Sequence, residues 1–88
     1  MLSGDVVEMS RLLDAGAEPD ALVAARDDDG TVYQSTALVE AANRGQLDVV
    51  RLLLYRGADP SLADSDGDTA LMAAAGSGQA GVVRELAA

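Results

Sequence analysis

The sequence of 88 residues contains no cysteine and no histidine. Without cysteine, neither disulfide bonds nor thiolate metal sites can form. Without histidine, the commonest general base and the commonest metal ligand of proteins are missing, so a nucleophile cannot be activated by an imidazole. We therefore expect no catalytic residues, no cofactor and no metal ion in this chain.

Aromatic residues and lysine are also scarce. Tyr33 and Tyr55 are the two aromatic residues, and all six basic residues are arginine. Alanine, leucine and valine supply most of the apolar content, which suits close packing of one helix on another. A chain of this length forms at most one small domain with a modest core.

Negative charge dominates the composition. Fifteen acidic residues against six basic ones give a net charge of −9 at pH 7. This excess excludes the usual electrostatic route to nucleic acids and anionic membranes, and it favours basic protein partners. No stretch approaches the roughly 18 apolar residues of a spanning helix, and the N-terminus lacks the pattern of a secretory signal. We expect a cytoplasmic or nuclear protein that binds neither nucleic acid nor membrane.

The strongest positive signal is an internal repeat with a period of 33 residues. The triplet Thr36-Ala37-Leu38 recurs as Thr69-Ala70-Leu71, and a partial earlier copy occupies residues 4–17. After the triplet each copy has two alanines, a glycine and two valines: Ala41-Ala42, Gly45 and Val49-Val50, then Ala74-Ala75, Gly78 and Val82-Val83. A fixed period of this size is typical of stacked repeats, each too small to bury its own apolar face.

Within each copy, the apolar spacing predicts a pair of helices. Thr36 and Thr69 precede the first apolar residues, so both are predicted N-caps, each contributing about 1 kcal/mol. The second helix of the complete pair is expected over residues 47–56. Asp48 would lie in its first turn and Arg56 in its last, which the helix dipole favours.

These spaced residues resemble the ankyrin repeat family. The matching positions are Gly67, Thr69-Ala70-Leu71, Ala74-Ala75, Gly78 and Val82-Val83 in one copy, and Thr36-Ala37-Leu38, Ala41-Ala42, Gly45, Val49-Val50, Leu53-Leu54 and Gly57-Ala58-Asp59 in the other. The resemblance implies an all-α solenoid of stacked helix–turn–helix repeats with projecting β-hairpin fingers. The sequence departs from the family pattern where Ala37 and Ala70 replace proline and where Val39 and Met72 replace histidine.

The resemblance covers nearly the whole chain, so we expect a single ankyrin repeat domain over residues 1–88. It divides into a partial repeat with a long finger (1–30), a complete repeat (31–66) and a second partial repeat (67–88). Neither end carries a polar capping repeat. We expect either a segment of a longer array or a short member of the family that associates with itself through exposed helices, with Val82, Val83 and Leu86 forming an apolar surface.

The first finger is expected to be extended. Compared with the second finger, it has four additional residues on each side of its Asp-Gly turn. A symmetric addition preserves cross-strand register, and it would lengthen a hairpin by about 13 Å. The arms would be residues 22–26 and 31–35. The alternative is a disordered surface loop, because two unsupported strands are only marginally stable in water.

The acidic residues cluster in these fingers. Residues 18–30 and 59–68 hold nine acids and one base, Arg26, which accounts for −8 of the net −9. Because fingers of a stacked array point the same way, we expect one negative edge. The alternative explanation is the ordinary preference of aspartate for turns.

Two short motifs have some residues of a ligand-binding loop, but each lacks others that the loop requires. Asp64-Ser65-Asp66-Gly67-Asp68 could begin a calcium loop, but Thr69 and Ala75 stand where that loop requires glycine and glutamate. The glycines that flank Ser77 lack the preceding strand and the following lysine of a phosphate loop.

Partner-binding residues are assigned from the resemblance, which places the binding surface at the finger tips and the end of the first helix. We expect Met9 and Met72 to fill gaps between helices and Tyr55 to lie against the stack or its rim. Tyr33 is either an interface anchor or packed across the hairpin. Carried over position by position, the candidates are Arg26, Asp28, Thr31, Tyr33, Gln34, Asn43, Arg44, Asp66, Asp68 and Ser77.

The sequence thus predicts a non-enzymatic module that binds another protein. It would present an acidic finger edge and a concave helix-end surface to a basic or mixed partner surface. The alternative is a regulatory or targeting segment of a larger enzyme, such as a kinase or a ubiquitin ligase.

Overall fold

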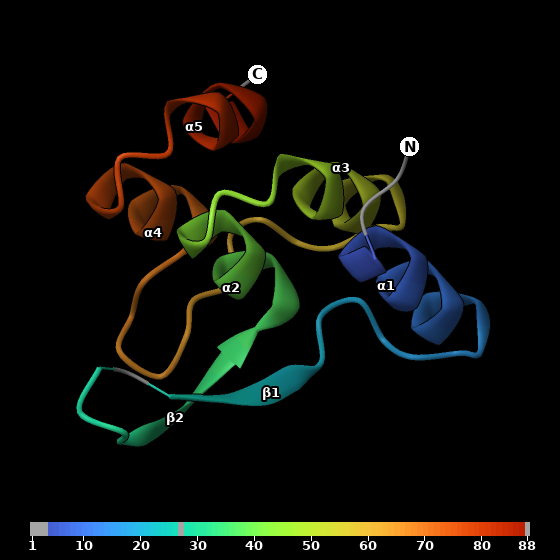
Figure 1. The fold of residues 1–88 in the computed structure, drawn as a ribbon, viewed down its shortest axis with the longest axis horizontal. Coiled ribbons are helices and arrows are strands. Elements are labelled where there is room, and N and C mark those ends of the chain that lie inside the picture. The colour runs from blue at the N-terminus through green and yellow to red at the C-terminus, as the bar shows by residue number, and fades with distance from the viewer. Residues whose placement is uncertain (1–3, 27, 88) are drawn as a thin grey trace.

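A single helix, a β-hairpin and two helix–turn–helix units follow one another along the chain (Figure 1). The computed structural model describes residues 4–26 and 28–87. The elements are α1 (Gly4–Asp14), β1 (Leu22–Arg26), β2 (Val32–Thr36), α2 (Ala37–Asn43), α3 (Leu47–Tyr55), α4 (Ala70–Gly76) and α5 (Ala80–Ala87).

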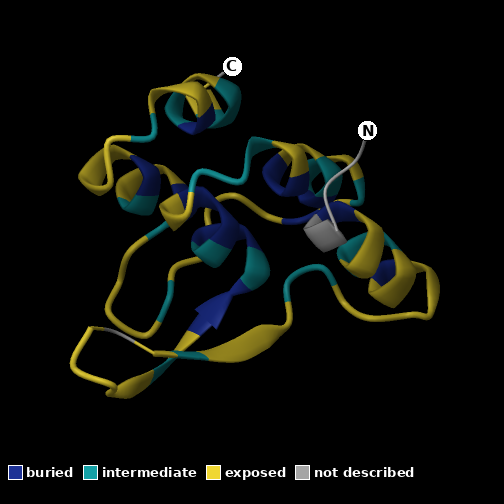
Figure 2. Ribbon diagram, viewed as in Figure 1, coloured by how far each residue is buried: buried dark blue, intermediate teal, exposed yellow. Residues whose placement is uncertain are grey.

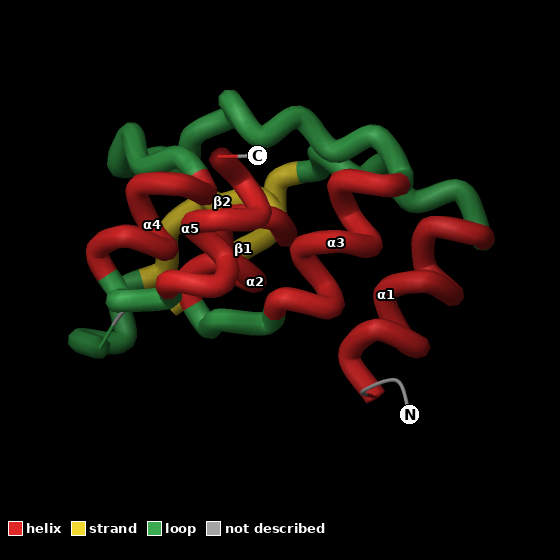
Figure 3. Tube along the Cα trace, turned by 90° about the horizontal axis from the view of Figure 1, so that it is seen from above, coloured by secondary structure: helices red, strands yellow, loops and turns green. Residues whose placement is uncertain are grey.

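The helices lie in two rows. The second helices of the units, α3 and α5, form an outer row together with α1, whereas α2 and α4 form an inner row next to the hairpin (Figure 1). Seen from above, α1 and α3 lie side by side (Figure 3). This arrangement agrees with the predicted stack of helical pairs carrying hairpin fingers. None of the helices in residues 4–26 and 28–87 is long and apolar enough to cross a lipid bilayer.

Both predicted N-caps are confirmed. The Thr36 hydroxyl accepts a hydrogen bond from the backbone N–H of Val39 at 3.1 Å, and the Thr69 hydroxyl accepts one from Met72 at 3.4 Å. Thr36 is also the last residue of β2, and Thr69 pairs with Ala63 in an isolated β-bridge. Each threonine therefore ends a finger and starts an inner helix, which fixes the direction in which the finger leaves the stack.

Helix α3 is one residue shorter than predicted. It ends at Tyr55, so Arg56 is its C-cap residue and does not belong to the last turn. The reason lies in the next residue, Gly57, whose φ of +94° is a left-handed conformation that glycine adopts without strain. Asp48 lies in the first turn, as expected.

The turn between α2 and α3 favours glycine because of its backbone conformation, since Gly45 has a φ of +72°. The side-chain amide of Gln79, from the turn of the next unit, lies next to Gly45 and donates to the Asn43 carbonyl at 3.5 Å. Consecutive turns therefore lie close together here, and a Cβ atom at this position would displace the end of the flexible Gln79 side chain.

The first finger is an ordered hairpin. Strands β1 and β2 pair antiparallel, from Leu22 opposite Thr36 to Arg26 opposite Val32. The returning strand β2 covers Val32–Thr36, one residue further along the chain than the predicted arm of residues 31–35. The second finger has a single bridge in place of two strands. The turn of the first finger includes Asp27, which lies outside the described residues.

The two fingers support each other through backbone contacts. The Gln34 N–H donates to the Ser65 hydroxyl at 3.1 Å, and the Ser65 N–H donates to the Gln34 carbonyl at 2.8 Å. Nearer the helices, the Asp20 carboxylate accepts the Asp59 N–H at 2.7 Å. These contacts supply the support that an isolated two-stranded hairpin lacks in water.

The apolar core lies between the two rows of helices (Figure 2). Leu53 and Val50 of α3 are its largest fully buried side chains. Alanines of α2 and α4 are equally buried, so these two helices approach closely. The buried apolar residues are Val6, Leu13, Leu38, Val39, Ala41, Ala42, Val49, Val50, Leu53, Ala58, Ala70, Ala74 and Val82. Met9 packs against this core, as predicted.

Met72 does not fill a gap between helices, contrary to the prediction. It is 57% exposed, whereas Val39, its counterpart 33 residues earlier, is 2% exposed. Leu71 and Leu38 differ in the same way. The cause is that α4 covers α2, while no helix within the described residues covers the equivalent face of α4.

Two further expectations are corrected. Tyr55 is 87% exposed, so it does not pack against the stack and the rim is the one of its two expected places that agrees with the structure. It comes two residues after the buried Leu53, a rotation of about 200° toward solvent. Val82 of α5 is buried in the core, and Val83 and Leu86 are partly buried against it. These three valine and leucine side chains therefore do not form one exposed apolar surface.

Thr36→Ala is expected to destabilise the fold more than Thr69→Ala. The Thr36 cap bond is buried, so its loss leaves the Val39 amide without a partner and costs about 1–2 kcal/mol. The Thr69 bond is longer and exposed, and its loss costs about 0.5–1 kcal/mol. Urea unfolding followed by circular dichroism measures both values. Thr36→Ser and Thr69→Ser retain the oxygen and serve as controls. Equal losses for the two alanine variants would contradict the assigned difference.

Candidate functional site

A groove of about 360 Å³ lies between the second finger and the inner helices α2 and α4. We call it the acidic groove, because Glu40, Asp64, Asp66 and Asp68 line it and none of its lining residues in the described part of the chain is basic. Apolar surface comes from Val39, Met72 and Ala73. The remaining lining residues are Tyr33, Asn43, Gly76 and Ser77.

Five of the ten predicted partner-binding residues meet in this groove. They come from four separate parts of the chain: a strand of the first finger, the second finger, the end of α2 and the end of α4. The five are Tyr33, Asn43, Asp66, Asp68 and Ser77.

The other five predicted residues lie elsewhere. Arg26, Asp28 and Thr31 are exposed near the turn of the first finger, and Gln34 binds the second finger through its backbone. Arg44, the C-cap residue of α2, lines a different groove, between α2 and α1.

The sequence interpretation missed Glu40, Asp64 and Met72. Helical spacing could have identified Glu40, because it lies three residues before Asn43 and therefore on the same face of α2. Asp64 was predicted as one of the acids of the fingers but not as a partner-binding residue, because its place in the groove depends on how the turn of the second finger folds. Met72 was missed because its exposure depends on what covers α4, which no local pattern encodes.

Hydrogen bonds hold two walls of the groove in place. The Tyr33 hydroxyl donates to Glu40 at 2.9 Å, so the half-buried tyrosine joins the first finger to α2. The Ser77 hydroxyl donates to the side-chain oxygen of Asn43, which joins α4 to α2. Tyr33 therefore packs within the structure and also lines the groove.

Asp64 shapes the second finger. Its carboxylate accepts the N–H groups of Asp66 and Asp68, both at 2.9 Å, and its carbonyl accepts the N–H of Gly67 at 3.0 Å. These bonds close the turn and leave the carboxylates of Asp66 and Asp68 exposed to solvent. Asp64 is thus a structural residue of the groove, whereas Asp66 and Asp68 are exposed.

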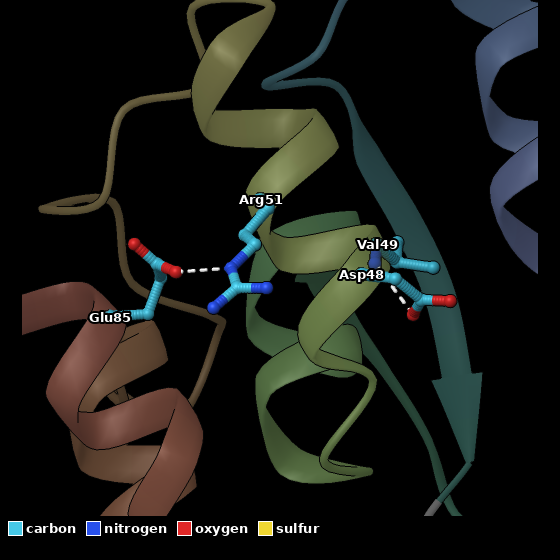
Figure 4. A network of polar contacts seen from close by, with 4 residues as sticks. All are labelled: Asp48, Val49, Arg51 and Glu85. Carbon is cyan, nitrogen blue, oxygen red and sulfur yellow. Dashed lines mark hydrogen bonds and ion pairs between the residues drawn. The ribbon is translucent and has the colours of Figure 1, made fainter. Parts of the chain in front are cut away.

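Arginines pair with acids on the outer row of helices, away from the groove. Arg51 of α3 forms an ion pair with Glu85 of α5, and Asp48 of the same helix accepts the Val49 N–H at 2.9 Å (Figure 4). Arg56 pairs with Asp14 at 2.8 Å. Exposed pairs of this kind contribute only about 0.2–1 kcal/mol each. Their larger effect is to keep positive charge on the outer row.

A hydrogen-bonded turn lowers the pKa of Asp59. The Ser61 hydroxyl donates to its carboxylate at 2.7 Å and the Ser61 N–H donates at 2.9 Å, and both bonds favour the ionised form. The folded-state pKa lies below the ordinary value of 3.8. The contribution to stability is therefore complete above that value and is lost as the pH falls through the folded-state pKa.

Within residues 4–26 and 28–87, no group of three or more acidic side chains is arranged to hold a metal ion. In the second finger, the carboxylates of Asp59 and Asp64 accept hydrogen bonds from the turn.

Comparison with known proteins identifies the repeats. The family model described as Ankyrin repeats (3 copies) matches residues 3–88. An ankyrin repeat-containing protein of Treponema pallidum (strain Nichols) is 54% identical over 41 residues, which are 47% of this chain and 14% of that protein. The E3 ubiquitin-protein ligase hecd-1 of Caenorhabditis elegans is 56% identical over 39 residues, which are 44% of this chain and 2% of the ligase. The chain thus spans a small part of the length of each relative.

Ser61→Ala is expected to raise the pKa of Asp59 toward its ordinary value, because the largest cause of the shift is the Ser61 hydroxyl. Titration of the Asp59 carboxyl carbon by NMR, from neutral pH to about pH 2, measures the change. Ser65→Ala, in the other part of the same finger, is the control and should leave the Asp59 titration unchanged. An unchanged Asp59 pKa in Ser61→Ala would contradict the assigned cause.

Proposed function

The chain belongs to the ankyrin repeat family, and from this premise we propose that it is a protein-binding module whose acidic groove binds a basic segment of a partner. Ankyrin repeats are non-catalytic interaction units that present extended concave surfaces. The proposed domain is the whole chain, divided at residues 30 and 66 into a partial repeat with a long finger, a complete repeat and a second partial repeat.

The combination of charge and apolar surface in the acidic groove carries the proposal. Two exposed carboxylates, Asp66 and Asp68, stand next to the exposed apolar side chain of Met72. Arginine fits such a site, because its guanidinium binds carboxylates while its aliphatic stem packs on apolar surface. We therefore propose a partner segment that places arginine beside a leucine, methionine or phenylalanine side chain.

The first finger extends this surface. Its tip carries Arg26, Asp28 and Thr31, all exposed, and its backbone is fixed to the second finger at Gln34. We propose that the tip contacts the partner beyond the groove, where a charge of each sign suits a mixed surface.

A regulatory segment of a larger enzyme is the second candidate function. The match to a ubiquitin ligase favours it, but this match covers 39 residues, and they make up 2% of the ligase. The similarity to the ligase therefore concerns its repeats alone. In either case the described residues would act by binding a protein.

The proposal is tested with a labelled peptide of arginine, leucine and glycine, and with a counterpart in which glutamate replaces arginine. We expect the arginine peptide to bind and the glutamate peptide not to bind. Asp66→Asn together with Asp68→Asn should weaken binding by about 5- to 30-fold, because each partly exposed ion pair contributes about 0.5–1 kcal/mol. Fluorescence anisotropy at low and high salt measures these effects.

The matched control is Glu18→Gln together with Asp48→Asn, which removes the same charge from exposed positions outside the acidic groove and outside the groove between α2 and α1. Its affinity should change by less than about twofold at physiological ionic strength, since distant exposed charges are screened. Equal weakening by both double variants would show a general charge effect and would reject the groove as the binding site.

A further inference from the structure

A second groove, of about 330 Å³, lies on the side of α2 that faces α1 and β1. Leu12 of α1 and Val23 of β1 line it, and both side chains are exposed, together with the half-buried Met9. We call it the α1–α2 groove. Exposed apolar side chains that line a groove between three elements are a reason to examine it as a contact surface.

The internal repeat shows what packs on this face of an inner helix. Ala70 and Ala74 of α4 are fully buried where α4 packs on α2, and Ser77 beside them bonds Asn43 of α2. These residues form a stripe at helical spacing. The residues 33 positions earlier form the same stripe on α2, completed by Glu40: Ala37, Glu40, Ala41 and Arg44. All four line the α1–α2 groove, where Ala41 is buried at the floor, Ala37 and Glu40 are half-buried and Arg44 is exposed.

We propose that the α1–α2 groove binds an amphipathic helix of a basic partner protein. The face of α2 that α4 covers provides the pattern for the contact surface of this helix. That face consists of Leu38, Val39 and Ala42, which are all buried, whereas their counterparts on the uncovered side of α4 are exposed. The bound helix would accordingly present two aliphatic side chains and an alanine to α2.

The charged residues of the α1–α2 groove distinguish the helix that fits it from the inner helix of an ordinary repeat. Glu40 and Arg44 occupy the positions that Ala73 and Ser77 have in α4, and Glu8 adds a carboxylate from α1. The helix therefore needs a cationic side chain toward the two glutamates. It also needs a carboxylate opposite Arg44, at the place where Asn43 meets Ser77 in the packed pair.

A second copy of this chain fits the groove poorly. Two chains with a net charge of −9 repel each other. The uncovered helix of a second copy would be α4, which is joined to α5 by residues 77–79. Its α5 would then need the place beside α3 that α1 occupies. A lone helix from a basic partner has neither difficulty.

The probe is a hydrocarbon-stapled peptide with residues 35–46 of this chain, in which lysine replaces Ser35 and Gln46. Stapling is needed because a helix of this length is marginal in water. We expect saturable binding to the intact chain, measured by fluorescence anisotropy. Asn43→Asp in the peptide should tighten binding, and Asn43→Lys should weaken it, because this position faces Arg44 of the chain. Equal affinities of these two peptides would overturn the proposed orientation.

Protein variants locate the site. Leu12→Glu together with Val23→Glu should weaken binding by about tenfold or more, because both side chains would contact the helix. Leu71→Glu together with Met72→Glu changes equally exposed apolar residues at the opposite end of the stack, and it should have little effect. Loss of binding in the second variant alone would overturn the proposal and place the peptide on α4. Circular dichroism verifies that both variants are folded.

Two further outcomes complete the test. No saturable binding of any peptide would reject the site. Dimerisation of the chain alone in sedimentation velocity, abolished by Leu12→Glu with Val23→Glu, would replace the partner helix with a second copy. The double variant Asp66→Asn with Asp68→Asn leaves the α1–α2 groove unchanged, so it should not alter binding of the stapled peptide. Failure of the acidic groove and failure of the α1–α2 groove are therefore distinguishable.

Discussion

The packing of α4 on α2 through alanine side chains sets the spacing of the whole molecule. Ala70 and Ala74 are fully buried at this contact, so the two inner helices approach as closely as small side chains allow. The close approach brings together two fingers that are about one repeat apart in sequence, and it lets Gln34 and Ser65 exchange hydrogen bonds. The ordered first finger and the acidic groove both depend on this spacing.

Charge is separated across the stack in a way that follows from the repeat. Arg51 and Arg56 lie on or next to α3 and pair with acids of the outer row, whereas the fingers carry most of the carboxylates. Asp64 uses its carboxylate to close the turn of the second finger, and Asp66 and Asp68 remain exposed. The result is a nearly balanced row of outer helices and fingers with an excess of carboxylates.

Helix α2 stands between two surfaces with different chemistry. One side, together with α4 and the second finger, forms the acidic groove, and the other side, together with α1 and β1, forms the α1–α2 groove. Glu40 lines both grooves and accepts the Tyr33 hydroxyl, so the same side chain connects the first finger to both surfaces. A substitution of Glu40 would therefore affect both grooves. For this reason, variants that test one groove alone change other residues.

The sequence by itself determined the repeat, the N-caps at Thr36 and Thr69, and the position of the extended finger, because caps, turns and helical periodicity are local properties. It also identified five residues of the acidic groove by their repeat positions. Only the tertiary structure decided that Met72 is exposed while Val39 is buried, that Arg44 lines a different groove from Asn43, and that Glu40 joins the acidic set. These properties depend on which element covers a given helix face, and identical sequence positions in successive repeats have different neighbours.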